Sequence, residues 1–443
     1  MLASHRASLL LQLYIIGIPL WWMLGIDFLI PQCLAILLIY VNLNAHRKFN
    51  RTDLILLSII ISLTISSYFV GFLISNYTMR FIAALYNLSL WIVGLIVIQQ
   101  VRHQLERGEA SRDALLRAGY WAFLVFVAVA TTSIGLAYAT HRFSLVVPSV
   151  FGLFVGNAVP DGAVIVAQAT RLVFARPDWG LPGVPMPRLT IYGPYPTATG
   201  AVAAIGGTLA LLYLETVRRV PAVGIFALEG LIVLMLAFTL TRSILAGWLA
   251  GWVVANLVFG TAFRRVAACG ALIATLLSVS FVNLSDAVQY REYSSESRFR
   301  NYMRAFNDTL IESPVFGLGV KPREEGNHIA IGSHSTIVSS FTKGGAIGFS
   351  LVFAYLALIP LYRWILLIIP ESRDEWDRYR HCQAEWRILL NLQIAIWVWL
   401  CFEDIDAPAT AATLIFIAFS LIEATTRRAG RERTTRAWAG EGR

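Results

Sequence analysis

Residues 80–101 read RFIAALYNLSLWIVGLIVIQQV, and this stretch decides the class of fold. Its one charged residue, Arg80, stands at the edge, and the apolar run behind it is long enough to cross a hydrocarbon core of roughly 30 Å. Similar runs recur along the 443 residues, which are 57% hydrophobic and 14% charged, with a mean hydropathy of +0.64. This composition is far from that of a soluble globular protein. The sequence predicts an all-α polytopic membrane protein.

We expect about twelve transmembrane helices, at residues 8–26, 28–43, 53–75, 80–101, 115–138, 197–216, 220–240, 243–262, 266–284, 344–369, 387–402 and 408–424. The basic residues support this count because they gather in alternate short loops, as cytoplasmic loops do. The pattern puts both termini inside the cell. It also explains the formal charge of +9 without a nucleic-acid partner.

The spans and loops predict six segments. Residues 1–138 hold the N-terminal spans and 139–196 a first long outside loop, rich in Pro and Gly. Central spans occupy 197–284, a second and larger outside loop 285–343, the C-terminal spans 344–424, and a basic, disordered tail 425–443. An apolar stretch at 144–156 is too short and interrupted for a span, which indicates an interfacial or re-entrant segment. We expect the first span to remain as a membrane anchor, because no cleavable signal peptide is evident.

The second outside loop contains an amphipathic helix at 296–312. Its apolar residues recur at helical spacing, as Phe299, Tyr302, Met303, Phe306 and Leu310. We expect the helix to lie along the membrane surface, apolar face down. Ser295 is a plausible N-cap, which would place Arg298 in the first turn, where free N–H groups favour an anion. Pro314 would end the helix, and Gly317 and Gly319 would permit a tight turn.

His334 follows among small residues, just before the tenth span. Imidazole takes up a proton near neutral pH and so suits a general base, and the small neighbours leave room for a bulky acceptor. The alternative is a surface or capping histidine. His328 is a rival, although Arg323, Glu324 and Glu325 indicate a solvated loop there.

Three arginines are candidate phosphate ligands. Arg188 precedes the sixth span, Arg242 occupies a very short outside turn, and Arg298 lies on the amphipathic helix. Guanidinium groups bind phosphate in a bidentate manner, so the three are suited to converge on one diphosphate. A charge beside the membrane is costly unless paired or used, and the alternative for Arg242 is a snorkelling anchor.

Other acidic residues are weaker candidates. Glu229 and Glu215 lie within predicted spans, where an ionisable side chain suggests function, but nothing nearby specifies a role. Asp404 and Asp406 form an outside turn that we interpret as solvated. The four cysteines show neither metal-ligand spacing nor a disulfide framework, and no P-loop or zinc motif appears. We therefore expect no metal and no cofactor.

Four stretches together resemble the bacterial O-antigen ligase and polymerase superfamily. They are Arg188 with Tyr192-Gly193-Pro194-Tyr195-Pro196; Thr241-Arg242-Ser243; Arg298 followed by Ser313-Pro314-Val315-Phe316-Gly317-Leu318-Gly319; and His334-Ser335-Thr336 followed by Gly345-Ala346-Ile347-Gly348. Each motif alone is weak, whereas their order, spacing and shared outside location are specific. Ser335 stands where many members have Asn.

The resemblance implies a multi-pass protein of the bacterial inner membrane with its site facing the periplasm. Such enzymes transfer a glycan from undecaprenyl diphosphate to a sugar hydroxyl by an inverting reaction without metal or nucleotide. In ligases the acceptor is lipid A–core. By the resemblance His334 would accept the acceptor's proton, while Arg188, Arg242 and Arg298 would stabilise the departing diphosphate. The partners would be these two glycolipids and membrane lipid, with no nucleic acid.

Two other functions stay open. A polymerase of the same superfamily would use a second lipid-linked repeat unit as acceptor, and we prefer a ligase only modestly. A secondary transporter also commonly has twelve helices with both ends inside. Transporters usually carry broken helices in corresponding positions of two halves, whereas the long polar insert here has no counterpart in the first half.

Overall fold

The computed structural model describes residues 2–41, 49–74, 78–106, 108–155, 159, 164–181, 184–281, 292–322, 330, 332, 334–369, 382–405 and 408–440. The first helices are α1 (Leu2–Leu24), α2 (Ile30–Val41), α3 (Arg51–Ile65) with its π-helical extension η1 (Ser66–Ile74), α4 (Thr78–Glu106) and α5 (Glu109–Ala139). The first long loop contains β1 (Leu145–Pro148), α6 (Val150–Val155), α7 (Val164–Ala169), β2 (Arg171–Leu181) and β3 (Val184–Leu189).

The second half is again helical. Central helices are α8 (Pro196–Leu212) with η2 (Tyr213–Val217), α9 (Ala222–Phe238), α10 (Arg242–Phe259) and α11 (Ala262–Phe281). The second long loop contains α13 (Glu292–Glu312). The last helices are α14 (Thr336–Phe353), which continues through η3 (Ala354–Leu358) into α15 (Ile359–Ile368), then α17 (Gln383–Phe402) and α18 (Ala409–Gly440).

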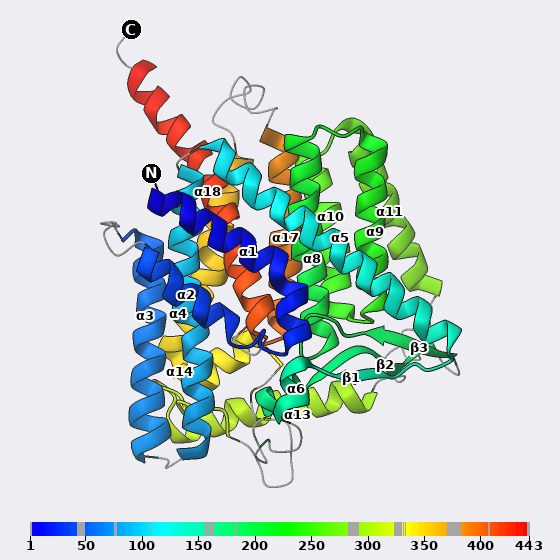
Figure 1. Cartoon of the computed structure of the whole chain (residues 1–443). Helices are drawn as coiled ribbons and strands as arrows, with labels where there is room; N and C mark the ends of the chain where they lie inside the picture. The colour runs from blue at the N-terminus through cyan, green and yellow to red at the C-terminus, as the bar shows by residue number, and fades with distance from the viewer. Residues whose placement is uncertain are drawn as a thin grey trace.

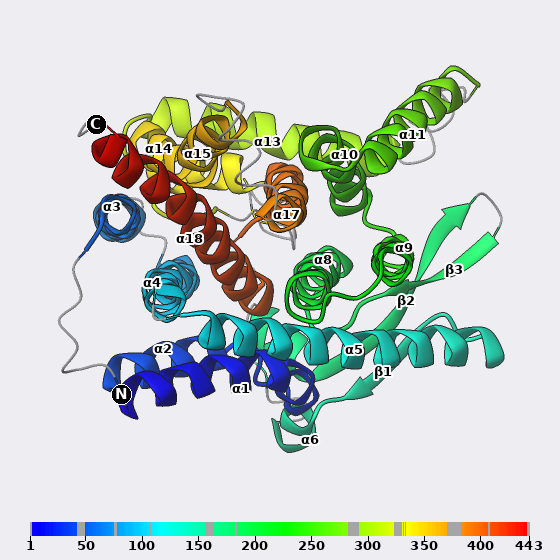
Figure 2. The same ribbon diagram turned by 90° about the horizontal axis from the view of Figure 1, so that it is seen from above.

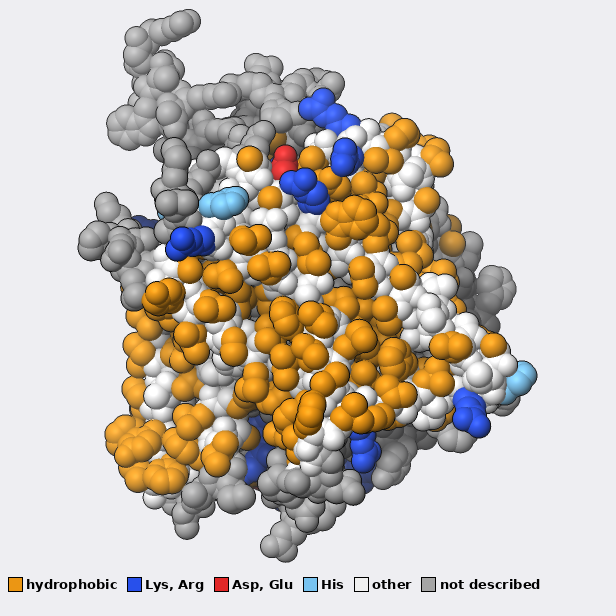
Figure 3. All heavy atoms as spheres, in the orientation of Figure 1, with side chains coloured by type: hydrophobic (Ala, Val, Ile, Leu, Met, Phe, Trp, Pro, Cys, Tyr) orange, Lys and Arg blue, Asp and Glu red, His pale blue; other side chains and the backbone are white. Residues whose placement is uncertain are grey.

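The helices confirm a polytopic, predominantly α-helical membrane protein. Within the described part of the chain, nine helices are long and apolar enough to cross a membrane, and α2 and α9 are shorter apolar helices. Every predicted span coincides with a helix, while twelve crossings as such stay a prediction. Figure 3 shows the apolar side chains that lipid would contact, in a band between basic residues near the top and bottom.

The two long loops lie at the same end of the molecule. In Figure 1 the sheet and α13 lie at the bottom, whereas both ends of the chain lie at the top. This arrangement agrees with the alternation of basic loops in the sequence. The helix α13 runs across the bottom with Phe299, Met303, Phe306 and Leu310 exposed, as expected of a helix that rests on a membrane surface.

The first long loop contains strands that the sequence did not lead us to expect. β1, β2 and β3 form an antiparallel sheet in that order, with Ala175 opposite Leu189 and Arg176 opposite Arg188. The prolines are tolerated because β3 is an edge strand and the pairing of β1 stops at Ala175. Within the apolar stretch 144–156, Leu145–Pro148 form β1 and Val150–Val155 form α6, and the side chain of Phe154 in α6 is 86% exposed.

Three predicted boundaries were wrong. α13 begins at Glu292, so Ser295 is not its N-cap and Arg298 lies in the second turn. α14 begins at Thr336, eight residues before the predicted span, because it bends at Gly345 instead of starting there. The predicted disordered tail continues α18 to Gly440.

The helices α8 and α18 lie near the middle of the bundle (Figure 2). Each is 89% buried over its most apolar window, more than the other candidate spans. The residues of α8 are mainly Ala, Gly and Thr, whose small side chains let neighbouring helices approach closely. A Cβ on Gly200 would lie 2.7 Å from Ile244 of α10. α8 thus anchors the segment before it, residues 188–195, to the core.

Candidate functional site

The bend in α14 receives the loop that follows α13. Gly345 has φ 58° and ψ −155°, a conformation open to glycine but strained for other residues, and it interrupts the helical hydrogen bonds. The loop replaces them: Leu318 N donates to Thr342 O (2.7 Å), Gly319 N to Lys343 O (3.1 Å) and Ala346 N to Pro314 O (2.9 Å). The loop segment 314–319 and the bend of α14 around Gly345 therefore form one interlocked unit.

Two serines of η1 hold this unit from the other side. Ser66 Oγ donates to the carbonyl oxygens of Phe316 and Lys343, and Ser67 Oγ donates to Gly319 O at 2.7 Å. Gly317 and Gly319 both have positive φ, as the predicted tight turn requires. A π-helical turn aims these hydroxyls at the loop, and such turns often mark functional regions.

The amphipathic helix positions His334. Asn301 of α13 accepts from Gly332 N at 2.6 Å, and the neighbouring Tyr302 Oη donates to His334 O at 2.5 Å. His334 has φ 70°, an uncommon conformation outside glycine that costs about 1–3 kcal/mol. Contacts from α13 therefore hold the histidine in a strained backbone instead of leaving it on a free loop.

A buried carboxylate lies next to the histidine segment. Thr336, two residues after His334, donates its N–H and its hydroxyl to Glu403 O at 2.9 and 2.7 Å. The side chain of Glu403 is 3% exposed, and its Oε1 lies 3.9 Å from Nη2 of Arg298, which is 37% exposed. Helices α13, α14 and α17 thus bring Arg298, His334 and Glu403 together.

Arg188 approaches the same carboxylate from β3. Its charge acts on Glu403, as does that of Arg298, and its Nε donates to Thr239 O at 2.9 Å. Thr239 is three residues before Arg242, the first residue of α10, whose side chain is exposed. The α17 residue Trp399 donates to Thr197 O (3.0 Å) and ties the start of α8 to this group. The charges of Arg188 and Arg298 thus both act on Glu403, and the backbone partner of Arg188 lies in the turn that leads to Arg242.

The histidine is neutral in this setting. Burial lowers the pKa of His334 to about 4, and the charges of Arg298 and Lys321 act in the same direction. A neutral imidazole is able to accept a proton, but burial and the nearby positive charges make this one a weak base. An anion bound at Arg298 would cancel part of that positive potential and raise the histidine's pKa towards neutrality.

The carboxylate shows the opposite shift. Burial raises the pKa of Glu403 to about 7, against the charge of Arg298, the Thr197 hydroxyl and the charge of Arg188. Such a group is a functional candidate, because its protonation changes near physiological pH. Sequence analysis missed Glu403. The signal was an acidic residue directly after an apolar span, on the same side as His334.

The turn after α17 is not solvated as we predicted for its acidic residues. Asp404 is 4% exposed, and its Oδ2 contacts Nζ of Lys321, which is 8% exposed. The contact ties the loop after α13 to the turn after α17, at the residue that follows Glu403. Asp406 and the rival histidine His328 lie outside the described residues. Within the described ranges no three His, Cys, Asp or Glu side chains gather in a way that could hold a metal ion.

The intramembrane acids are paired. Glu229 Oε1 lies 3.0 Å from Arg264 Nη1 and 2.9 Å from Arg387 Nη1, and Trp252 Nε1 donates to its other oxygen at 3.1 Å. Arg387 Nη2 also binds Glu215 Oε2 at 2.5 Å. This cluster joins η2, α9, α11 and α17. Since the charges satisfy one another, we assign Glu229 and Glu215 a structural role.

Comparison with known proteins gave no match to any family model and no matching curated protein. The resemblance carried by the motifs therefore stays a prediction. The geometry contributes an independent observation, because motifs far apart in the sequence meet at one end of the molecule around Arg298, His334 and Glu403.

Proposed function

We propose that this protein is a glycosyltransferase of the O-antigen ligase type, working at the periplasmic face of the bacterial inner membrane. Its donor would be a glycan on undecaprenyl diphosphate and its acceptor a sugar hydroxyl of lipid A–core. The observation that carries the proposal is the meeting of Arg188, Arg298 and His334 around the buried Glu403, at the end of the bundle where α13 lies flat.

The arginines would act on the leaving group. As the bond between the anomeric carbon and the phosphate oxygen breaks, the electron pair and negative charge pass to the diphosphate. Arg188, Arg298 and the adjacent Arg242 would stabilise that charge in a site partly shielded from water. Glu403 would hold Arg298 in place before the donor arrives, since the two side chains lie 3.9 Å apart.

The histidine would act on the acceptor. The acceptor oxygen attacks the anomeric carbon from the face opposite the diphosphate, which inverts the configuration, and its proton passes to a nitrogen of His334. Binding of the anionic donor would raise the pKa of His334 just when a base is needed, because it neutralises Arg298. The histidine would then be matched to the reaction only in the donor complex.

The apolar surface around the site is suited to the lipid tails of the donor and the acceptor. α13 exposes Phe299, Met303, Phe306 and Leu310 at the same end as the site, and Phe306 stacks on Phe341 of α14 with 5.1 Å between ring centroids. A helix docked in this way would let a polyprenyl chain stay in the bilayer while its diphosphate reaches the arginines.

The test is transfer by purified full-length protein in detergent. Undecaprenyl diphosphate-linked glycan is the donor, and lipid A–core and a lipid-linked repeat unit are separate acceptors. We expect core-linked product from wild type, and about 100-fold or more loss in kcat/KM for His334→Ala and Arg298→Ala, as for removal of a catalytic base or charge stabiliser. Arg300→Ala is the matched control, because Arg300 lies on α13 but its side chain is 65% exposed.

The products separate the alternatives. Chain growth on the lipid-linked repeat would make the protein a polymerase. Absence of both products with a verified donor would reject transferase activity and favour transport. Equal activity of wild type and His334→Ala would reject the histidine as base, and equal loss in Arg300→Ala would show that the Arg298 effect is not local.

A further inference from the structure

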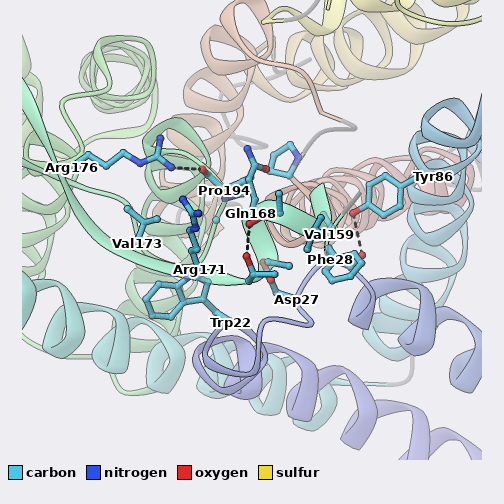
Figure 4. A pocket seen from close by; sticks show the side chains of 16 residues that line it. Trp22, Asp27, Phe28, Tyr86, Val159, Gln168, Arg171, Val173, Arg176 and Pro194 are labelled. Carbon is cyan, nitrogen blue, oxygen red and sulfur yellow. Dashed lines mark hydrogen bonds between the residues drawn. The ribbon is translucent and has the colours of Figure 1, made fainter. Parts of the chain in front are cut away.

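A cavity of about 460 Å³ lies at the same end of the molecule as the candidate site. Its walls come from the turn between α1 and α2, from α4 and α7, from β2, from the segment before α8 and from the start of α18. Ligand pockets in proteins span roughly 300–1,000 Å³, so the volume suits a short oligosaccharide. Figure 4 shows Tyr86 and Phe28 on the right of this cavity and Val173 and Arg176 on the left.

One part of the wall is aromatic. Trp22 packs edge-on against Phe174 and Tyr192, with ring centroids 5.0 and 5.3 Å apart, and Tyr86 Oη donates to Phe28 O at 3.1 Å. These contacts fix the rings before any ligand binds. Fixed aromatic rings offer flat apolar surfaces on which the C–H faces of sugar rings pack.

A half-buried carboxyl group, that of Asp27, lies in the same wall of the cavity. The backbone N–H groups of Asp27 and Phe28 donate to the Asp27 side chain, while burial raises its pKa to about 6. The carboxylate accepts hydrogen bonds, and so is suited to bind sugar hydroxyls. Aromatic faces with a few placed polar groups are typical of small-molecule sites.

Two exposed arginines complete the cavity. Arg176 Nη2 makes one long hydrogen bond, 3.5 Å, to Pro194 O, and neither Arg171 nor Arg176 forms an ion pair with a carboxylate of the described residues. Arg176 stands directly opposite Arg188 in the β2–β3 register. Like charges facing each other across strands are destabilising unless an anion lies between or beside them.

The pairing of β2 with β3 also indicates which part of the donor lies next to the cavity. Arg188 belongs to the proposed diphosphate site, and its cross-strand neighbour Arg176 lines the cavity, so the two binding regions share one face of the sheet. The sugar attached to the diphosphate must leave that site in some direction, and the cavity is directly adjacent. His334, where the acceptor would be deprotonated, does not line it.

We infer that this cavity is a subsite for an acidic sugar residue of the donor glycan, held by Arg171 and Arg176 through its carboxylate or phosphate, by Asp27 through its hydroxyls and by Trp22, Phe28 and Tyr86 through its ring. The assignment to the donor rests on the proposed function. The presence of an acidic-saccharide site does not rest on the proposed function, because it is argued from the residues that line the cavity.

Direct binding tests the site without any transfer reaction. Purified full-length protein in detergent is titrated calorimetrically with trigalacturonic acid, with the neutral trisaccharide maltotriose and with inorganic pyrophosphate. We expect the acidic trisaccharide to bind wild type, and the variant Arg171→Gln/Arg176→Gln to bind it about tenfold more weakly, since two charge-assisted hydrogen bonds are lost. Arg142→Gln is the matched control, an exposed arginine on the same loop but outside the cavity wall.

Pyrophosphate and maltotriose identify what the arginines bind. Pyrophosphate affinity should fall in Arg298→Ala and stay unchanged in the double variant. If instead the double variant loses pyrophosphate binding and keeps the acidic trisaccharide, the cavity belongs to the diphosphate and the inference is wrong. Equal affinity of wild type and the double variant for the acidic trisaccharide, or tighter binding of maltotriose, overturns it as well.

Transfer kinetics with a donor glycan that contains an acidic sugar test the assignment to the donor. We expect the double variant to raise the KM for that donor about tenfold, with kcat and the KM for the acceptor unchanged. A change in the acceptor KM instead would overturn the assignment. If wild type binds the acidic trisaccharide but transfers nothing, the proposed function fails and the cavity site stands. If transfer occurs and the double variant matches wild type in both assays, the function stands and the cavity inference fails.

Discussion

His334 and Glu403 illustrate how the surroundings of a side chain, and not its type, decide its chemistry. Histidine is a residue type expected of a general base, yet burial and two neighbouring cations lower the pKa of His334 to about 4. The glutamate is an ordinary acid whose burial raises its pKa to about 7. An anion near Arg298 would oppose the electrostatic part of this shift, so on the proposed function donor binding would make His334 a stronger base.

The raised pKa of Glu403 predicts a specific dependence of stability on pH. Its folded-state pKa of about 7 exceeds the value near 4.3 of an unfolded glutamate, so the folded protein holds the proton more tightly. The resulting stabilisation is complete below about pH 4 and is lost as the pH rises through about 7. Between about pH 5 and about pH 8, wild type should therefore lose on the order of 1–3 kcal/mol relative to Glu403→Gln, which does not titrate.

Thermal unfolding of both proteins in detergent across this pH range measures the difference. Glu296→Gln is the control, because the side chain of Glu296 is 55% exposed and its removal should leave the pH dependence of wild type intact. Parallel curves for wild type and Glu403→Gln would show that the buried carboxyl does not titrate in this range.

At the scale of elements, the bend in α14 and the loop after α13 depend on each other. The helix gives up hydrogen bonds at Gly345, and the loop residues Pro314 to Gly319 make them instead. Neither element is complete alone. Because α14 begins at Thr336, two residues after His334, the same interlocking sets where the histidine stands relative to Glu403.

We expect Gly345→Ala to destabilise this unit strongly. The positive φ alone costs about 1–3 kcal/mol in a non-glycine residue, and a Cβ would lie 2.4 Å from the carbonyl of Val315. The melting temperature should fall, and transfer should fall with it. Gly230→Ala in α9 is the control, because a Cβ there meets nothing within 4 Å and should leave stability unchanged or raise it by up to about 1 kcal/mol. Equal melting temperatures for Gly345→Ala and wild type would contradict the interlocked arrangement.

At the scale of the whole molecule, the two long loops share one end and the chain termini the other (Figure 1). The ion cluster around Glu229 joins four elements within the bundle, whereas Arg298, Glu403 and His334 lie with the long loops. The basic residues of the short loops predict that the end with the termini faces the cytoplasm.

Cysteine labelling on either side of the membrane span formed by α5 tests this orientation. In a variant without the four native cysteines, Ser144→Cys should react with a membrane-impermeant thiol reagent added outside cells whose outer membrane is permeabilised. Ala110→Cys should react only after the inner membrane is opened. Both positions are exposed, at opposite ends of one candidate span. The reverse pattern of labelling would overturn the predicted orientation and, with it, the periplasmic site.

The sequence by itself determined the membrane class, the positions of the helices, the amphipathic face of α13 and the glycine turn after it. These features depend on hydrophobicity, its period and backbone freedom, which are local along the chain. The small antiparallel sheet escaped prediction, because proline-rich strands are stabilised by partners such as Leu189 opposite Ala175, which sequence periodicity does not reveal.

Only the tertiary structure decided which residues meet. It brought Arg298 from α13, Arg188 from β3 and His334 to Glu403, which sequence analysis had passed over, and it buried Asp404 against Lys321 where the sequence indicated a solvated turn. Burial and the distance between charges set the pKa and therefore the chemistry of each group. Both depend on contacts between segments far apart in the sequence, such as those of Arg298 and Glu403, which no local pattern contains.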